Sequence, residues 1–111
     1  MALNEPRLIR KYANRRLYDT VRSRYVNIID VRNLLVEGHA VRIVEQSSGR
    51  DITNSILLMI IEGMERVDGA LLTTEFLTDL IKTAGNSPDS GLAQRLNAAL
   101  RDSLQRPTLS I

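Results

Sequence analysis

The part of the chain best suited to chemistry with a partner is the segment of residues 7–26, RLIRKYANRRLYDTVRSRYV. It holds seven cations against one acid, Asp19, and it contains all three tyrosines of the chain. Arginine presents a planar fork of N–H donors that fits phosphate oxygens and the edge of guanine. Tyrosine adds a rigid ring and a hydroxyl that can bond phosphate or stack on a base. These residue types predict a nucleic-acid interface made by Arg7, Arg10, Lys11, Tyr12, Asn14, Arg15, Arg16, Tyr18, Arg22, Arg24 and Tyr25. A solvated basic surface with tyrosines in the core is the alternative.

Within this segment, Asn14, Arg15 and Arg16 form a bend that leads into a predicted strand. A two-stranded ribbon is slim enough to enter the major groove, where Asn pairs with adenine and Arg with guanine. Successive strand residues point to opposite faces, so Arg16 and Tyr18 share one face. We expect this pair to face DNA, with Arg15 nearer to phosphate or to Asp19.

Composition limits the remaining possibilities. The 111 residues contain no cysteine, which excludes disulfides and thiol chemistry. Residues 1–50 hold ten cations and five acids, whereas residues 51–111 hold five cations and eight acids. This asymmetry is typical of a chain whose first half meets a polyanion and whose second half meets protein. The N-terminus does not resemble a signal peptide, and no apolar run approaches the ~20 residues of a membrane span, so we expect a cytoplasmic protein.

The sequence offers no candidate catalytic or metal centre. His39 is the only histidine and follows a glycine, as in a surface turn. Glu62 and Glu65 are three residues apart, a spacing that fits a solvated helix end better than a shared metal or proton. We therefore predict that the protein is not an enzyme and needs neither cofactor nor metal.

Hydrophobic patterning predicts a small α+β domain in which an N-terminal basic β-hairpin and further short strands pack on helices, with C-terminal helices for oligomerisation. Asn27 is the expected N-cap of a first helix that ends at Gly38, and a strand follows near Val41. Asp51 or Thr53 caps a second helix. A third helix starts at Thr73 or Thr74 and ends at Gly85, and a fourth starts at Ser87-Pro88. We expect a DNA-binding domain over residues 1–68 and a helical oligomerisation arm over residues 69–111, with residues 107–111 disordered.

Two features predict self-association. Residues 56–61 are six consecutive apolar residues, and a helix that is apolar all round must be buried on every side. A leucine repeats every fourth position along the last predicted helix, a spacing typical of helix pairing. The expected subunit interface comprises Ile56, Met59, Ile60, Leu92, Leu96, Leu100 and Leu104.

Four stretches of the chain resemble one bacterial family. KYANRRLYDT, SRYVNIIDVRNLL, GRDITNSILLMII and LLTTEFLTDLI are similar to the DNA-binding domain of the polyhydroxyalkanoate accumulation regulators, the polyhydroxyalkanoate synthesis repressors. The similarity is dense over residues 7–61. Ala13 stands where the family usually has proline, and Thr83-Ala84 stand where an aromatic pair is common.

The resemblance implies a cytoplasmic transcriptional repressor of polyhydroxyalkanoate synthesis and granule-associated protein genes. It also implies release from DNA on binding of the polymer or its granules. The partners implied are double-stranded DNA, the chain itself as dimer or tetramer, and the polymer or granule surface. Two other hypotheses stay open: an oligomeric interaction protein whose basic patch binds acidic proteins or granule surfaces, and an RNA-binding regulator.

Overall fold

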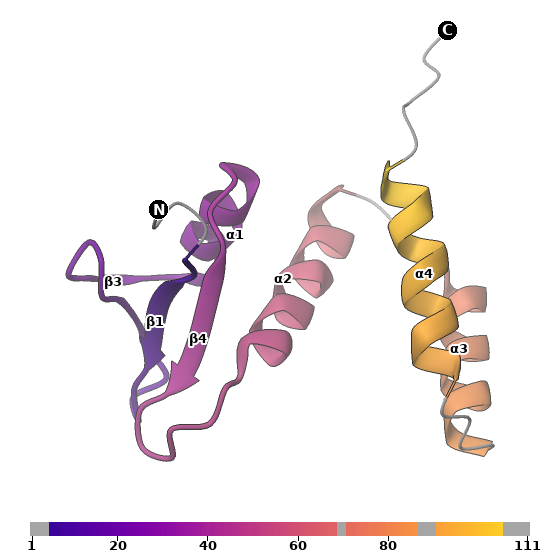
Figure 1. Cartoon of the computed structure of the whole chain (residues 1–111), viewed down its shortest axis with the longest axis horizontal. Coiled ribbons are helices and arrows are strands. Elements are labelled where there is room, and N and C mark those ends of the chain that lie inside the picture. The colour runs from indigo at the N-terminus through magenta and orange to yellow at the C-terminus, as the bar shows by residue number, and fades with distance from the viewer. Residues whose placement is uncertain (1–4, 69–70, 87–90, 106–111) are drawn as a thin grey trace, which may run out of the picture. The chain divides into compact units, whose positions relative to one another are not determined.

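The computed structural model describes residues 5–68, 71–86 and 91–105, and the chain divides into two compact units, residues 1–71 and 72–111 (Figure 1). Among the described residues, the first unit contains four strands and two helices, and the second contains two helices. The elements in chain order are β1 (Arg7–Lys11), β2 (Leu17–Asp19), β3 (Arg24–Val26), α1 (Ile28–Val36), β4 (Val41–Glu45), α2 (Thr53–Asp68), α3 (Thr74–Asn86) and α4 (Leu92–Gln105). The predicted α+β class is confirmed.

The four strands form one sheet in the order β3-β2-β1-β4. Strands β1, β2 and β3 are joined by two antiparallel hairpins, and β4 returns beside β1 in parallel after α1. The predicted hairpin is therefore confirmed, but the sequence did not predict that it shares a sheet with the strand near Val41. Strand β1 joins them because Ile9 is the register partner of Asp19 on one side and of Ile43 on the other.

Helix α1 has a capping motif at each end. The Asn27 side chain accepts a hydrogen bond from the Asp30 backbone N–H at 2.8 Å, and the Asp30 carboxylate accepts one from the Asn27 N–H at 2.9 Å. This capping box satisfies two backbone donors that the helix leaves free. At the other end, Gly38 has φ +98°, and the N–H groups of Gly38 and His39 donate to the carbonyls of Leu35 and Leu34. These are the two bonds of a Schellman motif, so the predicted cap and stop are both confirmed.

The carboxylate of Asp51 accepts two hydrogen bonds at the start of helix α2. Thr53 donates to Asp51 Oδ1 through its hydroxyl at 2.6 Å and through its backbone N–H at 2.9 Å. The hydroxyl bond from Thr53, followed by the backbone bond, lowers the pKa of Asp51 below its usual value. The same hydroxyl accepts from the Ile43 N–H at 2.8 Å, which links the start of α2 to β4.

One aliphatic core holds the first unit together. It lies between the sheet, through Ile9, Leu17 and Ile43, and one face of each of the helices α1 and α2. The helices contribute Val31, Leu34, Ile56 and Ile60, all buried. Alternation along the strands accounts for this layout, since every second strand residue points to the helices.

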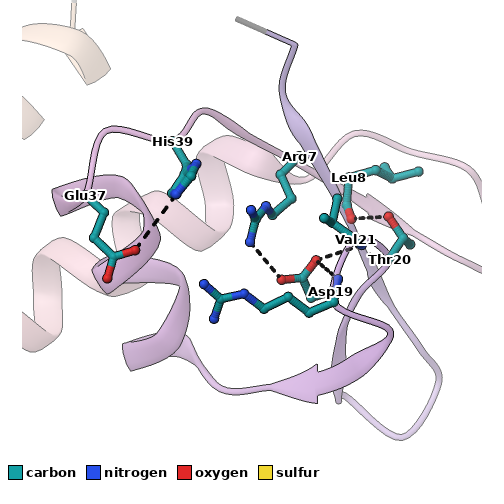
Figure 2. Close-up of polar contacts among 8 residues, drawn as sticks. Arg7, Leu8, Asp19, Thr20, Val21, Glu37 and His39 are labelled. Carbon is teal, nitrogen blue, oxygen red and sulfur yellow. Dashed lines mark hydrogen bonds and ion pairs between the residues drawn. The ribbon is translucent and has the colours of Figure 1, made fainter. Parts of the chain in front are cut away.

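The carboxylate of Asp19 is fully buried within this unit (Figure 2). It accepts from Arg7 Nη1 at 3.3 Å and from the backbone N–H groups of Val21 and Arg22 at 2.9 and 3.2 Å. Thr20, the next residue, donates through its hydroxyl to the Leu8 carbonyl at 2.7 Å. Asp19 therefore ties β1 to β2 and fixes the turn that leads to β3.

The second unit has no buried residue in either of its helices. Helix α3 starts at a Thr73 cap, where the hydroxyl accepts from the Phe76 N–H at 3.0 Å, and it runs through Gly85 to Asn86, one residue past the predicted end. The described part of α4 begins at Leu92. The predicted start at Ser87-Pro88 and the predicted disorder of residues 107–111 lie outside the described residues. None of the described helices is long and apolar enough to cross a membrane.

Asp19 gives the first prediction. Asp19→Ala should lower the free energy of unfolding by about 2–4 kcal/mol, because it removes three hydrogen bonds and leaves Arg7 without its buried partner. Urea unfolding followed by circular dichroism measures this loss. Glu37→Ala is the matched control: its exposed contact with His39 spans 3.9 Å and should change stability by less than about 0.5 kcal/mol. Equal effects of the two substitutions would contradict the role given to Asp19.

Candidate nucleic-acid interface

The sheet face opposite the helices gathers the tyrosines and part of the basic segment. Leu17 and Asp19 point to the helices, so Tyr18 between them points away. The register then places its neighbours Arg10 of β1 and Tyr25 of β3 on the same outer face. We call this surface the tyrosine face, which comprises Arg10, Tyr12, Arg16, Tyr18 and Tyr25.

The three tyrosine rings form a closed cluster on this face. Tyr18 and Tyr25, direct cross-strand partners, have ring centroids 5.3 Å apart at an interplanar angle of 81°. Tyr12 completes the triangle at 6.2 Å from Tyr18 and 6.5 Å from Tyr25. Edge-to-face contacts of this kind stabilise aromatic pairs beyond their buried area. The three rings therefore hold one another in place. They lie outside the main core, so the alternative of core tyrosines is wrong.

Arg16 extends the cluster. Its guanidinium carbon lies 4.4 Å from the centroid of the Tyr25 ring, a cation–π distance. Arg16 and Tyr18 both contact the Tyr25 ring, so they share one face of the sheet, as predicted. Arg10 lies beside Tyr18 and donates to Gln46 Oε1 at 2.9 Å. Gln46 follows β4 and is far from the segment in sequence, so no local signal could have identified it.

The turn between β1 and β2 presents Asn14 and Arg15. The Arg15 N–H donates to the Tyr12 carbonyl at 2.8 Å, and the Tyr12 N–H donates to the Arg16 carbonyl at 3.0 Å. These bonds make a three-residue hairpin loop whose last residue is left-handed, and Arg15 has φ +66°. That conformation favours glycine, so an arginine there costs backbone strain.

Asn14 supports this turn. Its Oδ1 accepts from the Arg16 N–H at 3.0 Å, as in an Asx turn. One acceptor position of the amide is therefore occupied by the fold, which limits the bidentate adenine contact expected for Asn14. Arg15 is exposed, and the arginine side chain that bonds Asp19 is that of Arg7.

The other basic residues are distributed elsewhere. Arg7 forms an ion pair with Asp19, and only 15% of its side chain is exposed. Lys11 and Arg24 lie on the helix side of the sheet by register, opposite Leu17 and Asp19 respectively. Arg22 is exposed in the turn before β3. The structure thus brings together five of the eleven predicted residues on the tyrosine face, with Asn14 and Arg15 at its adjoining turn.

A shallow hollow of about 460 Å³ adjoins the same turn. Its lining includes Arg15, Arg16, Leu17 and Tyr25, together with residues from the end of β3 to the start of α1, Asp30 among them. The hollow is therefore lined by two cationic side chains and one carboxylate.

The residues predicted at a subunit interface separate into two groups. Ile56 and Ile60 belong to the core of the first unit, whereas Met59 and its neighbour Leu58 are exposed. Packing on one side explains this, because α2 meets the sheet and α1 along a single face. On α4, Leu92 and Leu96 are half-buried, and Leu100 and Leu104 are exposed.

Comparisons with known proteins agree with the family resemblance. The model of the family described as "PHB/PHA accumulation regulator DNA-binding domain" matches residues 8–68. An uncharacterized protein of Allochromatium vinosum and an uncharacterized protein in the phbA 5′ region of Thiocystis violacea are each 38% identical over 98 residues, 88% of this chain. The chain spans 64% of the first relative's length and 71% of the second's. No solved structure matches the chain.

The matched residues include the sheet apart from Arg7, both helices of the first unit and the entire tyrosine face. On this evidence the chain belongs to the PHB/PHA accumulation regulator DNA-binding domain family.

Proposed function

We propose that this chain binds double-stranded DNA through the tyrosine face and its adjoining turn, as a transcriptional repressor of polyhydroxyalkanoate synthesis and granule-associated protein genes. The observation that carries the proposal is the joint placement of Arg10 and Arg16 with three fixed tyrosines on the face that the helices leave open. Arginine and tyrosine donors serve both phosphate and base contacts. The family match over residues 8–68 gives the DNA-binding class.

Duplex DNA is the nucleic acid that the ring geometry favours. Readers of unpaired RNA stack bases on open aromatic faces. Here the rings contact one another at 5.3–6.5 Å, and Arg16 lies over Tyr25. Tyr12 and Tyr18 are only partly exposed. A slim, rigid hairpin turn with arginine side chains suits the major groove better.

In this proposal the contacts divide by role. Arg16 reads a base edge, because it is fixed on the tyrosine face beside the turn. Arg10, Arg15 and Arg22 hold phosphates, and Arg7 acts through the fold by its bond to Asp19. Release by the polymer or its granules completes the regulatory cycle and rests on the family alone. Such a protein acts in the cytoplasm, where bacterial promoters lie.

The second unit serves self-association in the same proposal. Two helices without a buried residue, each with a marked apolar stripe, need a further surface to cover them. A second copy of the chain supplies one by pairing the stripes, and closed dimers are the commonest symmetric assembly. A dimer also presents two tyrosine faces to one duplex.

Salt dependence tests the proposed DNA binding. Fluorescence anisotropy with a labelled duplex should show affinity falling steeply with salt, with a log–log slope of about −0.9 per neutralised phosphate. Several contacts per dimer predict a slope of about −4 or steeper. Unlabelled duplex should displace the probe more effectively than single-stranded RNA of the same sequence. A flat salt response would favour the protein-interaction hypothesis, and preference for the RNA would favour the RNA-binding one.

Arg15→Gly separates function from stability. Glycine relieves the left-handed strain at φ +66°, so the free energy of unfolding should rise by about 0.5–1 kcal/mol while DNA affinity falls through the lost cation. Ser23→Gly is the matched control, since Ser23 has φ +55° in the other hairpin and carries no charge. It should gain similar stability and keep its affinity. If Arg15→Gly bound DNA as tightly as the native chain, Arg15 would not be a contact.

Leu104→Glu tests the association surface. Leu104 is 85% exposed in the single chain, so a charge there should leave the helix intact but weaken any contact that buries it. Light scattering at micromolar concentration should show a shift from oligomer to monomer. Ala98→Glu is the control. Ala98 lies about 200° around the helix from Leu100 and is therefore outside the leucine stripe. A native chain that is already monomeric would contradict the proposal.

A further inference from the structure

We propose that Tyr25 is a positioning residue for base readout: its ring fixes the Arg16 guanidinium in the orientation that meets a base edge. The inference rests on the proposed DNA binding and adds a dependence of one side chain on another. Tyr25 need not touch the DNA for this role.

The contact is well placed to restrain Arg16. The guanidinium carbon is 4.4 Å from the Tyr25 ring centroid. Stacking on an aromatic ring uses the flat face of a guanidinium, while its N–H donors project in the plane of the cation. Within the described residues, no carboxylate or carbonyl accepts from the Arg16 side chain, so these donors are open to an incoming ligand.

The platform is itself restrained. Tyr25 lies on the edge strand β3, where a lone exposed tyrosine would change rotamer freely. Two ring contacts hold it: Tyr18 at 5.3 Å and Tyr12 at 6.5 Å, both edge-to-face. Tyr18 belongs to β2 and Tyr12 directly follows β1, so residues from all three strands of the meander or next to them hold the ring on which Arg16 lies.

The backbone fixes the other end of Arg16. Its N–H donates to Asn14 Oδ1 at 3.0 Å, and its carbonyl accepts from the Tyr12 N–H at 3.0 Å. Root and tip of the side chain are thus both held before any ligand arrives. Ordering a flexible side chain at an interface costs binding free energy, and a preorganised one avoids that cost. Tyr25 therefore increases discrimination by keeping Arg16 ready.

The test is a double-mutant cycle on discrimination. The probes are a duplex that the native protein selects from a random-sequence pool and a scrambled duplex of the same composition. The measured quantity is the ratio of the two affinities. Arg16→Ala should lower this ratio at least about fivefold. Tyr25→Leu should lower the ratio about two- to fivefold. Tyr25→Phe keeps the ring and should leave the ratio at its native value.

The coupling decides the interpretation. In the Arg16→Ala background, Tyr25→Leu should cause no further loss, because Tyr25 acts through Arg16. Arg22→Ala is the control: Arg22 is exposed in the turn before β3 and holds phosphate in the proposed function, so its loss should weaken both duplexes about equally and leave the affinity ratio unchanged in either background. Additive losses for Tyr25→Leu would overturn the inference and indicate that Tyr25 contacts DNA by itself.

A measurement without DNA separates this inference from the proposed function. In the NMR spectrum of the free protein, the Arg16 side-chain protons should be shifted upfield by the Tyr25 ring. Tyr25→Phe should keep that shift and Tyr25→Leu should abolish it. A native protein that selects no duplex would overturn the proposed function. A protein that selects a duplex but shows no Arg16 shift would overturn only the inference.

Discussion

The buried carboxylate of Asp19 is the constraint on which the rest of the first unit depends. It joins Arg7 of β1 to the turn after β2, and a buried carboxylate is tolerated only when its hydrogen bonds are made (Figure 2). Because Asp19 points to the helices, Tyr18 beside it must point outward. The orientation of β2 therefore places a carboxylate in the interior and a tyrosine on the outer face of the sheet.

The same geometry explains why so many cations crowd one short segment without forming one patch. Strand alternation and two tight turns send them in different directions: Arg7 to Asp19, Lys11 and Arg24 to the helix side, and Arg16 to the tyrosine face. The tyrosine face accordingly holds only part of the basic segment. Ring contacts and backbone hydrogen bonds hold its members in place.

The two units differ in how they are stabilised. The first closes its own core between a sheet and two helices, and can hold a strained residue such as Arg15 at its turn. The second has two helices with apolar stripes, of which α3 is capped by Thr73, but neither helix has a buried residue. Helices of 13 and 14 residues are marginal by themselves in water, so both depend on a further surface over their apolar faces.

Sequence alone determined the local features: the Asn27 cap, the Gly38 stop, the hairpin and the shared face of Arg16 and Tyr18. These follow from short-range rules on capping, turns and alternation. Tertiary structure decided what long-range pairing controls. The parallel pairing of β1 with β4, the Arg7–Asp19 bond, the Arg10–Gln46 bond and the burial of Ile56 and Ile60 instead of their neighbours all join residues distant in the chain. Such contacts depend on which strand lies beside which, and no local pattern encodes that choice.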